Sequence, residues 1–180
     1  MADDLHTLEA KAFRRLQNRL LLRENLGRHQ PGCILVDGDN VVALRREHNM
    51  GDLSLDCVFE ILLLILEEGI PSRWVGIYFT SVMELELNDF EQRRFERLVD
   101  QGLFQRLPEK DPVMAWEEIS IPYQQNFVIL TNSLQDKPRW FRPHQISIGL
   151  TTEGGPNLEI TDLRDFIKRF YGLQNSEVVK

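Results

Sequence analysis

The chain has 180 residues, of which 42% are hydrophobic and 27% are charged, and its formal net charge is −7 at pH 7. The length suits a single domain with its own core, and the acidic balance excludes a uniformly basic surface that coats nucleic acid. The longest apolar run, residues 61–66, is too short to cross a bilayer, so we expect no membrane partner.

Two cysteines, Cys33 and Cys57, lie in apolar segments and lack the spacing of metal ligands. We expect both to be buried thiols, as in proteins of a reducing compartment. The N-terminus carries Asp3 and Asp4 and has no apolar stretch typical of a secretory signal. These features predict a cytoplasmic protein.

Residues 3–27 have apolar side chains at helical intervals, with a stripe formed by Leu8, Leu16 and Leu20. Such a helix either packs on the domain that follows or forms a surface for a homodimer or a protein partner. We therefore divide the chain into an N-terminal helical extension (1–30), one domain (31–173) and a flexible tail (174–180).

Further along, apolar runs alternate with helical patterns. Strands are predicted at 33–36, 74–79, 104–107, 126–131 and, as an edge strand, 145–150. A polar, arginine-bearing segment (41–51) leads to a helix near 55–69 that Asp52 or Ser54 can cap, and residues 154–156 predict a turn. A further helix is predicted at 87–102, with Phe90 and Phe95 facing inward. Another is predicted to begin at Asp111, with Pro112 in its first turn, and a last one runs from Thr161 or Asp162 to Phe170. This alternation predicts an α/β fold with a mostly parallel sheet between two helical layers.

Polar side chains follow two of these strands. Asp37, Asp39 and Asn40 come after the first, whereas Thr131, Asn132, Ser133 and Asp136 come after the fourth, and Asp111 opens the helix between them. The carboxyl ends of parallel strands lie at one edge of a sheet, where ligands collect. Hard oxygen donors of this kind suit Mg²⁺ or Mn²⁺. No P-loop, GxGxxG fingerprint or GxSxG elbow is present in the sequence.

These motifs together resemble the PIN-like NYN ribonucleases, in particular the Regnase-type branch. The resemblance covers about residues 32–171. It rests on short segments in the order of that family, at 34–41, 75–79, 98–102, 111–115, 128–132, 155–158 and 163–167. It implies a three-layer α/β/α, Rossmann-like PIN/NYN fold and endonucleolytic cleavage of RNA by a water activated by Mg²⁺ or Mn²⁺.

Carried over residue by residue, the resemblance implies that Asp37 is the first metal-binding aspartate and Asn40 its neighbour in the site. Asp111 corresponds to the acid at the start of the mid-chain helix. All three are therefore candidate catalytic residues, and both aspartates are candidate metal ligands.

The chain departs from the family after the fourth strand, where Ser133 stands in the place of an expected catalytic aspartate. Asp136 roughly matches a further acid of that loop and is a candidate catalytic residue and metal ligand. Asp39 is a second candidate to supply the missing charge. A serine hydroxyl substitutes poorly for a carboxylate, so we expect weaker metal binding than in the family.

Basic and aromatic residues near the expected site are candidates to bind single-stranded RNA, because they hold phosphates and stack on bases. They are Arg45, Arg46, Lys137, Arg139, Trp140 and Arg142. The alternative is an ordinary loop whose aromatic rings fill the edge of the core.

Two other interpretations remain open. Asp37 and Asp39 also resemble the DxDx[T/V] loop of HAD-type phosphatases, with Asp37 as nucleophile, Asp39 as general acid and base, and Thr131 as the phosphoryl-binding residue. The part of the sequence after Thr131 leaves little room for the lysine motif and the acidic metal motif of that family, which counts against this interpretation. The other interpretation is a PIN-like module that binds RNA or a protein without cleaving it.

Overall fold

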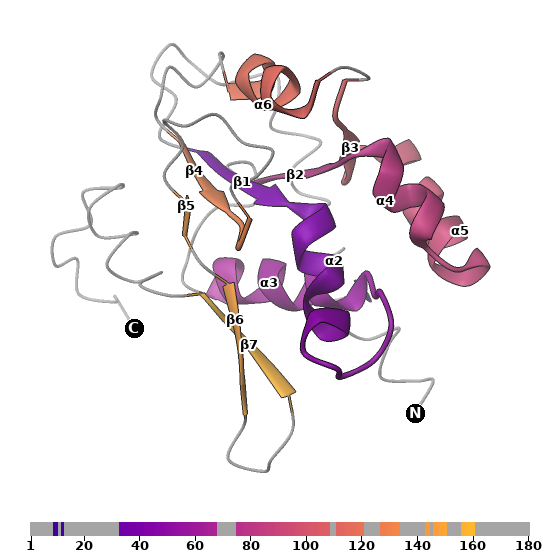
Figure 1. Ribbon diagram of the computed structural model, residues 1–180, viewed down its shortest axis with the longest axis vertical. Helices are drawn as coiled ribbons and strands as arrows, with labels where there is room; N and C mark the ends of the chain where they lie inside the picture. The colour runs from indigo at the N-terminus through magenta and orange to yellow at the C-terminus, as the bar shows by residue number, and fades with distance from the viewer. Residues whose placement is uncertain are drawn as a thin grey trace, which may run out of the picture.

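The computed structural model has strands and helices in alternation (Figure 1). It describes residues 9, 10, 12, 33–67, 75–108, 111–120, 127–133, 143, 144, 146–150 and 156–160. The strands in this part are β1 (Cys33–Asp37), β2 (Val75–Phe79), β3 (Gln105–Arg106), β4 (Phe127–Leu130), β5 (Pro143–His144), β6 (Ile146–Leu150) and β7 (Pro156–Ile160). The helices are α2 (Gly38–Glu47), α3 (Asp56–Glu67), α4 (Ser81–Glu86), α5 (Asp89–Asp100) and α6 (Pro112–Ser120).

The described strands β1 to β5 form one parallel sheet in the order β3-β2-β1-β4-β5. Leu35 at the centre of β1 lies opposite Gly76 of β2 and Ile129 of β4. The parallel α/β sheet that the sequence predicts is therefore confirmed. None of the described helices has the length and apolar character needed to cross a bilayer.

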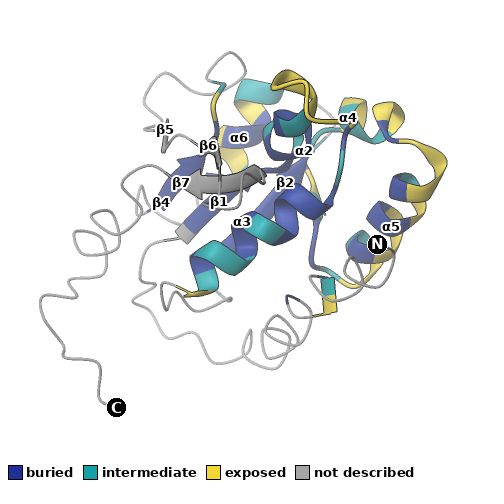
Figure 2. Ribbon diagram, turned by 90° about the horizontal axis from the view of Figure 1, so that it is seen from below, coloured by how far each residue is buried: buried dark blue, intermediate teal, exposed yellow. Residues whose placement is uncertain are grey.

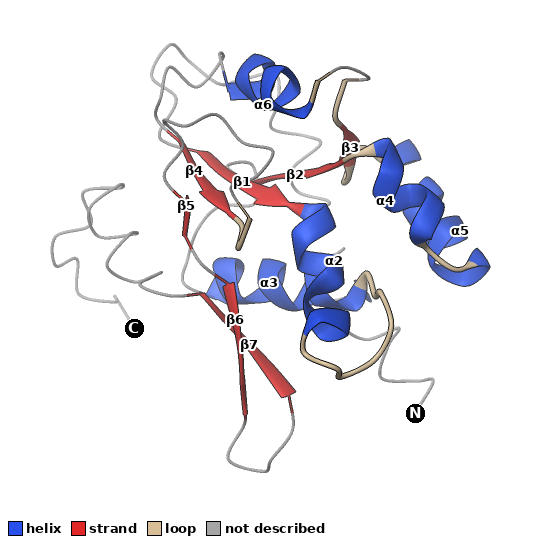
Figure 3. Cartoon of the chain, in the orientation of Figure 1, coloured by secondary structure: helices blue, strands red, loops and turns tan. Residues whose placement is uncertain are grey.

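The predicted edge strand at 145–150 is a strand, but it does not extend the parallel sheet. As β6 it pairs with β7 in a separate antiparallel ribbon (Figure 3). The β7 strand begins at Pro156, in the last position of the predicted turn. The predicted final helix, from Thr161 or Asp162, lies outside the described residues.

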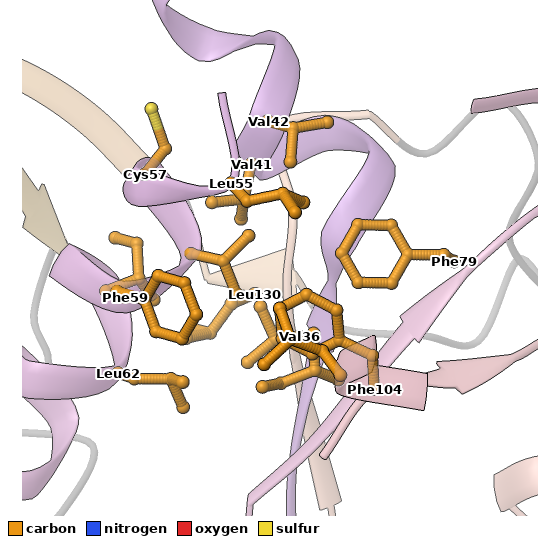
Figure 4. Close-up of a cluster of buried hydrophobic side chains, with 14 of the residues drawn as sticks. Val36, Val41, Val42, Leu55, Cys57, Phe59, Leu62, Phe79, Phe104 and Leu130 are labelled. Atoms are coloured by element: carbon orange, nitrogen blue, oxygen red, sulfur yellow. The ribbon is translucent and has the colours of Figure 1, made fainter. Parts of the chain in front are cut away.

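Both faces of the sheet are covered, because side chains alternate along a strand. Ile34 and Val36 of β1 pack in a large core with α2, α3 and α5, which Figure 4 shows around Val36. Leu35 points to the other face, where it packs with Tyr78 and with Trp116 of α6. Burial of each side chain of this size contributes roughly 1.5–3 kcal/mol relative to exposure. The buried strands between two helical layers (Figure 2) confirm the three-layer prediction.

Helix α2 corrects the prediction of a polar connecting segment at 41–51, because the chain passes from β1 into a helix with no loop between them. Asp37 ends the strand and also caps the helix, accepting a hydrogen bond from the backbone N–H of Asn40. A Cβ atom at Gly38 would lie 2.4 Å from the ring of Phe79. Only glycine therefore fits at this junction without moving the ring.

The helix predicted at 87–102 is confirmed as α5, which begins at Asp89 and ends at Asp100. The short helix α4 before it was not predicted. The side chain of Asn88 caps α5 by accepting two backbone N–H groups. Phe95 is fully buried as expected, but the inward position predicted for Phe90 is wrong, since Phe90 is 61% exposed. The guanidinium group of Arg94 lies over its ring, 5.5 Å from the centroid.

The described residues of the N-terminal segment pack against the domain. Ala12 is buried in the larger core. The carboxylate of Glu9 accepts a hydrogen bond of 2.9 Å from Arg94, which also pairs with Asp56 at 2.8 Å and with Glu91 at 2.9 Å. A buried guanidinium group with three carboxylates around it thus joins the N-terminal segment to α3 and α5.

Candidate active site

Polar residues gather where the central strands of the sheet end. Asp37 is the last residue of β1, Thr131 follows β4, and Thr80 follows β2. Since β1 lies between β2 and β4 and all three strands are parallel, these three positions share one edge of the sheet (Figure 1). This is the edge where the sequence predicts the site.

The carboxylate of Asp37 is only 3% exposed and is held from two directions. The backbone N–H of Asn40 donates to Oδ1 at 3.3 Å, and the hydroxyl group of Thr131 lies 2.8 Å from Oδ2. The same hydroxyl lies 2.9 Å from the carbonyl oxygen of Ser133, whose own N–H donates to it. Because a hydroxyl has one proton, Asp37 and Ser133 compete for it. The loop after β4 therefore contacts the carboxylate of Asp37 through the hydroxyl group of Thr131.

A second contact joins α2 to that loop. The side-chain oxygen of Asn40 accepts a hydrogen bond of 2.7 Å from the backbone N–H of Asn132. This bond fixes the orientation of the Asn40 amide beside Asp37. Ser133, at the position of the expected acid, is half-buried in the same loop.

Asp39 is held on the other side of β1. The backbone N–H of Thr80 lies 3.1 Å from each carboxylate oxygen of Asp39, and its hydroxyl donates to Oδ2 at 2.5 Å. Asp37 and Asp39 therefore contact opposite neighbours of β1, through Thr131 and Thr80. Thr80 was not predicted from the sequence, although a threonine directly after a buried strand was the available signal.

Asp111 is exposed at the start of α6, as predicted, and its carboxylate accepts a hydrogen bond of 3.2 Å from the backbone N–H of Met114. The next residue, Pro112, lines a pocket of about 560 Å³ together with Asp39. The first turn of α6 therefore lies at the same edge of the sheet as the first turn of α2.

The two arginines proposed for RNA binding lie in the last turn of α2 and are both paired with glutamates. Arg45 lies 2.7 Å from Glu60, and Arg46 lies 3.0 Å from Glu86. Burial raises the pKa of Glu60, against the opposing effect of Arg45. The positive charges of both side chains are thus already balanced within the protein.

The remaining candidates, Asp136, Lys137, Arg139, Trp140 and Arg142, lie outside the described residues. Within the described part of the chain, no group of three or more Asp, Glu, His or Cys side chains is arranged to hold a metal ion. The donors at the sheet edge are nevertheless hard oxygens, and Mg²⁺ commonly uses one or two carboxylates and keeps several waters. Oxygen donors of this kind are chemically suited to Mg²⁺ or Mn²⁺.

No protein-family model matches the chain, and no curated protein matches it. Similar solved structures include two of the nuclear protein-only RNase P 2 (PRORP2) of Arabidopsis thaliana. The first is 19% identical with a TM-score of 0.47, and the match covers 87% of this chain and 35% of that chain. The second is 17% identical with a TM-score of 0.46, and the match covers 88% and 35%. This chain therefore spans about a third of the length of those proteins.

Proposed function

We propose that this protein is a metal-dependent endoribonuclease that cuts single-stranded RNA. The observation that carries the proposal is the pair of hydrogen bonds between the ends of β1 and β4, from Thr131 to Asp37 and from Asn132 to Asn40. These bonds hold a carboxylate and an amide in fixed orientations at the edge of a parallel sheet. Fixed oxygen groups at this edge suit the binding of a phosphodiester through a divalent ion.

In this proposal Asp37 is the principal metal ligand, and Asp111 and Asp136 are candidates for further ligands. Asp39, which contacts Thr80 on the other side of β1, would reach the same ion only through a bound water. Asn40, Asp111 and Asp136 act with Asp37 in catalysis. A bound Mg²⁺ or Mn²⁺ would supply an activated water and would offset the charge that develops on the phosphate. Thr131 keeps Asp37 oriented through its hydroxyl group. With Ser133 in place of an acid, we expect activity to require a higher concentration of the ion than a site with one more carboxylate.

RNA contacts are proposed for Arg45 and Arg46, and for the later residues Lys137, Arg139, Trp140 and Arg142. A phosphate would have to replace the carboxylate of Glu86 beside Arg46. This exchange costs little, because exposed ion pairs contribute only about 0–1 kcal/mol.

The proposal extends to the organisation of the chain. The contacts of Glu9 and Ala12 support a helical extension (1–30) that packs on an RNA-cleaving domain (31–173), with a flexible tail (174–180). The rest of the extension would be available to a second copy or to a protein partner. We place this activity in the cytoplasm.

The contacts of the two aspartates favour a nuclease over a HAD-type phosphatase. A nucleophile and its acid–base partner have to face the same phosphate. Asp37, however, contacts Thr131 on one side of β1, and Asp39 contacts Thr80 on the other side. Asp37 also caps α2 directly, so its carboxylate is held at the helix end.

A second candidate function is a module that binds RNA without cleaving it. The observation that favours it is that Ser133, in the loop that contacts Asp37 through Thr131, stands where the resemblance implies an acid. In that case the sheet edge would bind the RNA backbone through neutral donors and arginines, and metal ions would have little effect.

An assay with two substrates separates these functions. The purified protein is incubated with end-labelled single-stranded RNA and with p-nitrophenyl phosphate, each in Mn²⁺ and in EDTA. We expect internal cuts in the RNA in Mn²⁺ alone and no hydrolysis of the monoester. RNA that is bound but uncut would support the binding module, and phosphate release would support the phosphatase. A protein that neither binds nor cuts RNA would contradict both RNA functions.

A further inference from the structure

The pocket beside Asp39 is a site separate from the Asp37 cluster. It has a volume of about 560 Å³ and opens at the carboxyl edge of the sheet, between α4, the residues after β3 and the start of α6. Its apolar walls are formed by Val82, Met83, Leu107, Pro108, Pro112 and Ala115. Its polar lining comes from Asp39, Thr80, Ser81 and Glu86. Apolar walls with a few polar groups, in a volume between 300 and 1,000 Å³, are typical of small-molecule sites.

The charge of this pocket restricts what it can hold. Two carboxylates, of Asp39 and Glu86, line it, and none of the described lining residues is Lys or Arg. Glu86 is paired with Arg46, and both side chains are about half exposed. A phosphate would therefore be repelled, whereas a group that donates hydrogen bonds would be attracted.

The apolar lining of the pocket suits an aromatic ring. Pro108 and Pro112 offer rigid apolar surfaces, and the thioether of Met83 makes favourable contacts with the edges of aromatic rings. Asp39 lies two residues after Asp37 in the first turn of α2, so the pocket begins beside the cluster that we propose to hold the phosphate. A nucleotide bound at Asp37 could thus place a neighbouring base in it.

We propose that this pocket binds a nucleobase with an exocyclic amino group, beside the phosphate that is cleaved, and that it prefers cytosine to uracil. This inference rests on the proposed function. The amino group of cytosine can donate a hydrogen bond to a carboxylate. Uracil has nearly the same shape but carries a carbonyl oxygen at that position, which a carboxylate repels. The pocket would therefore select the sequence at the cut, while the Asp37 cluster acts on the backbone.

The test measures binding in Ca²⁺, which also takes oxygen ligands and stands in for Mn²⁺, and gels verify that the oligomers stay intact. Fluorescence anisotropy gives the Kd for labelled oligocytidylate and oligouridylate of equal length. We expect the cytidine oligomer to bind about tenfold to a hundredfold more tightly, as one hydrogen bond to a charged group provides. Ser81→Trp, at an exposed lining position, should fill the pocket and bring the ratio near one. Glu86→Gln should also lower the ratio, because an amide can donate to the uracil oxygen.

Gln101→Trp, at an exposed position that does not line the pocket, is the matched control and should keep the wild-type ratio. Equal Kd values for the two oligomers in the wild type, together with RNA cleavage in Mn²⁺, would overturn the inference and leave the proposed function standing. A preference that survives Ser81→Trp would also overturn it. If neither oligomer binds or is cleaved, the proposed function itself fails.

Discussion

The hydroxyl group of Thr131 lies 2.8 Å from Oδ2 of Asp37 and joins the ends of two neighbouring strands at the candidate site. Thr131 is fully buried and Asp37 nearly so. If a buried carboxylate loses a hydrogen-bond donor, the free-energy cost of removing it from water is no longer offset, and the folded state is destabilised. This one contact therefore affects both the stability of the fold and the orientation of Asp37.

Replacing Thr131 with valine tests the hydrogen bonds of its hydroxyl to Asp37 and Ser133 together, because valine has nearly the same shape and no hydroxyl. We expect the free energy of unfolding to fall by about 1–3 kcal/mol, measured by urea denaturation. Thr131→Ser keeps the hydroxyl and loses one methyl group, so it should cost about 1 kcal/mol. A valine variant as stable as the wild type would show that these hydrogen bonds contribute nothing.

Gly38 is required by the approach of the Phe79 ring, which packs with Phe95 at 5.0 Å and with Phe104 at 4.9 Å between ring centroids. The added methyl group of Gly38→Ala has to displace this ring. We expect a loss of about 1–3 kcal/mol in the free energy of unfolding, as is usual for overpacking. The same change made in a Phe79→Leu background should cost clearly less, and equal costs in the two backgrounds would contradict the steric explanation.

Glu91 should make the protein less stable as the pH rises. Burial raises the pKa of Glu91 above its ordinary value of 4.5, against the opposing effect of Arg94. The folded state therefore binds this proton more tightly than the unfolded state does. The stabilisation from protonation is complete below pH 4.5 and is lost as the pH rises through the folded-state pKa. Denaturation of Glu91→Gln from pH 4 to pH 7 should show a shallower decline in stability than the wild type, and a steeper decline would contradict this.

Cys57 should be unreactive in the folded protein. Burial raises the pKa of its thiol to about 11, and the thiolate is the reactive form. In a Cys33→Ala variant, which leaves one cysteine in the chain, a thiol reagent at pH 8 should react only slowly. Addition of urea should make the reaction fast and complete. Rapid labelling without urea would show that Cys57 is accessible in the native state.

The strands at the centre of the sheet could be predicted because β1, β2 and β4 are continuous apolar runs. Helix α2 was missed because Asp37, which marks the end of a strand, also caps a helix. Helix α4 was missed because it has no buried residue and hence no apolar period. Helical spacing wrongly predicted that Phe90 faces inward. The side chain is 61% exposed, and the guanidinium group of Arg94 lies over its ring.

For the site, the sequence indicated the shared edge of Asp37 and Thr131, because parallel strands end together. The sequence did not indicate that Asp37 contacts Thr131 after β4 whereas Asp39 contacts Thr80 after β2. The bond between Asp39 and Thr80 joins residues 41 positions apart, and no local pattern encodes it. The pocket beside Asp39 was missed for the same reason, because its walls come from segments that meet only in the folded chain.

In the proposed function, the carboxylate of Asp37 supports metal-dependent cleavage of RNA. Asp37→Asn tests it with little change in structure, because asparagine also caps helices and can accept the N–H of Asn40. The matched control is Asp52→Asn, which makes the same chemical change at an exposed position beyond the other end of α2. Thermal unfolding of both variants would verify that they fold.

The decisive measurement is the rate of RNA cleavage in Mn²⁺ by the wild type and these two variants. We predict that Asp37→Asn lowers the rate about a hundredfold or more, since a bound ion is worth several kcal/mol to the transition state. Asp52→Asn should cleave at the wild-type rate. Cleavage by folded Asp37→Asn at the wild-type rate would contradict the proposed site.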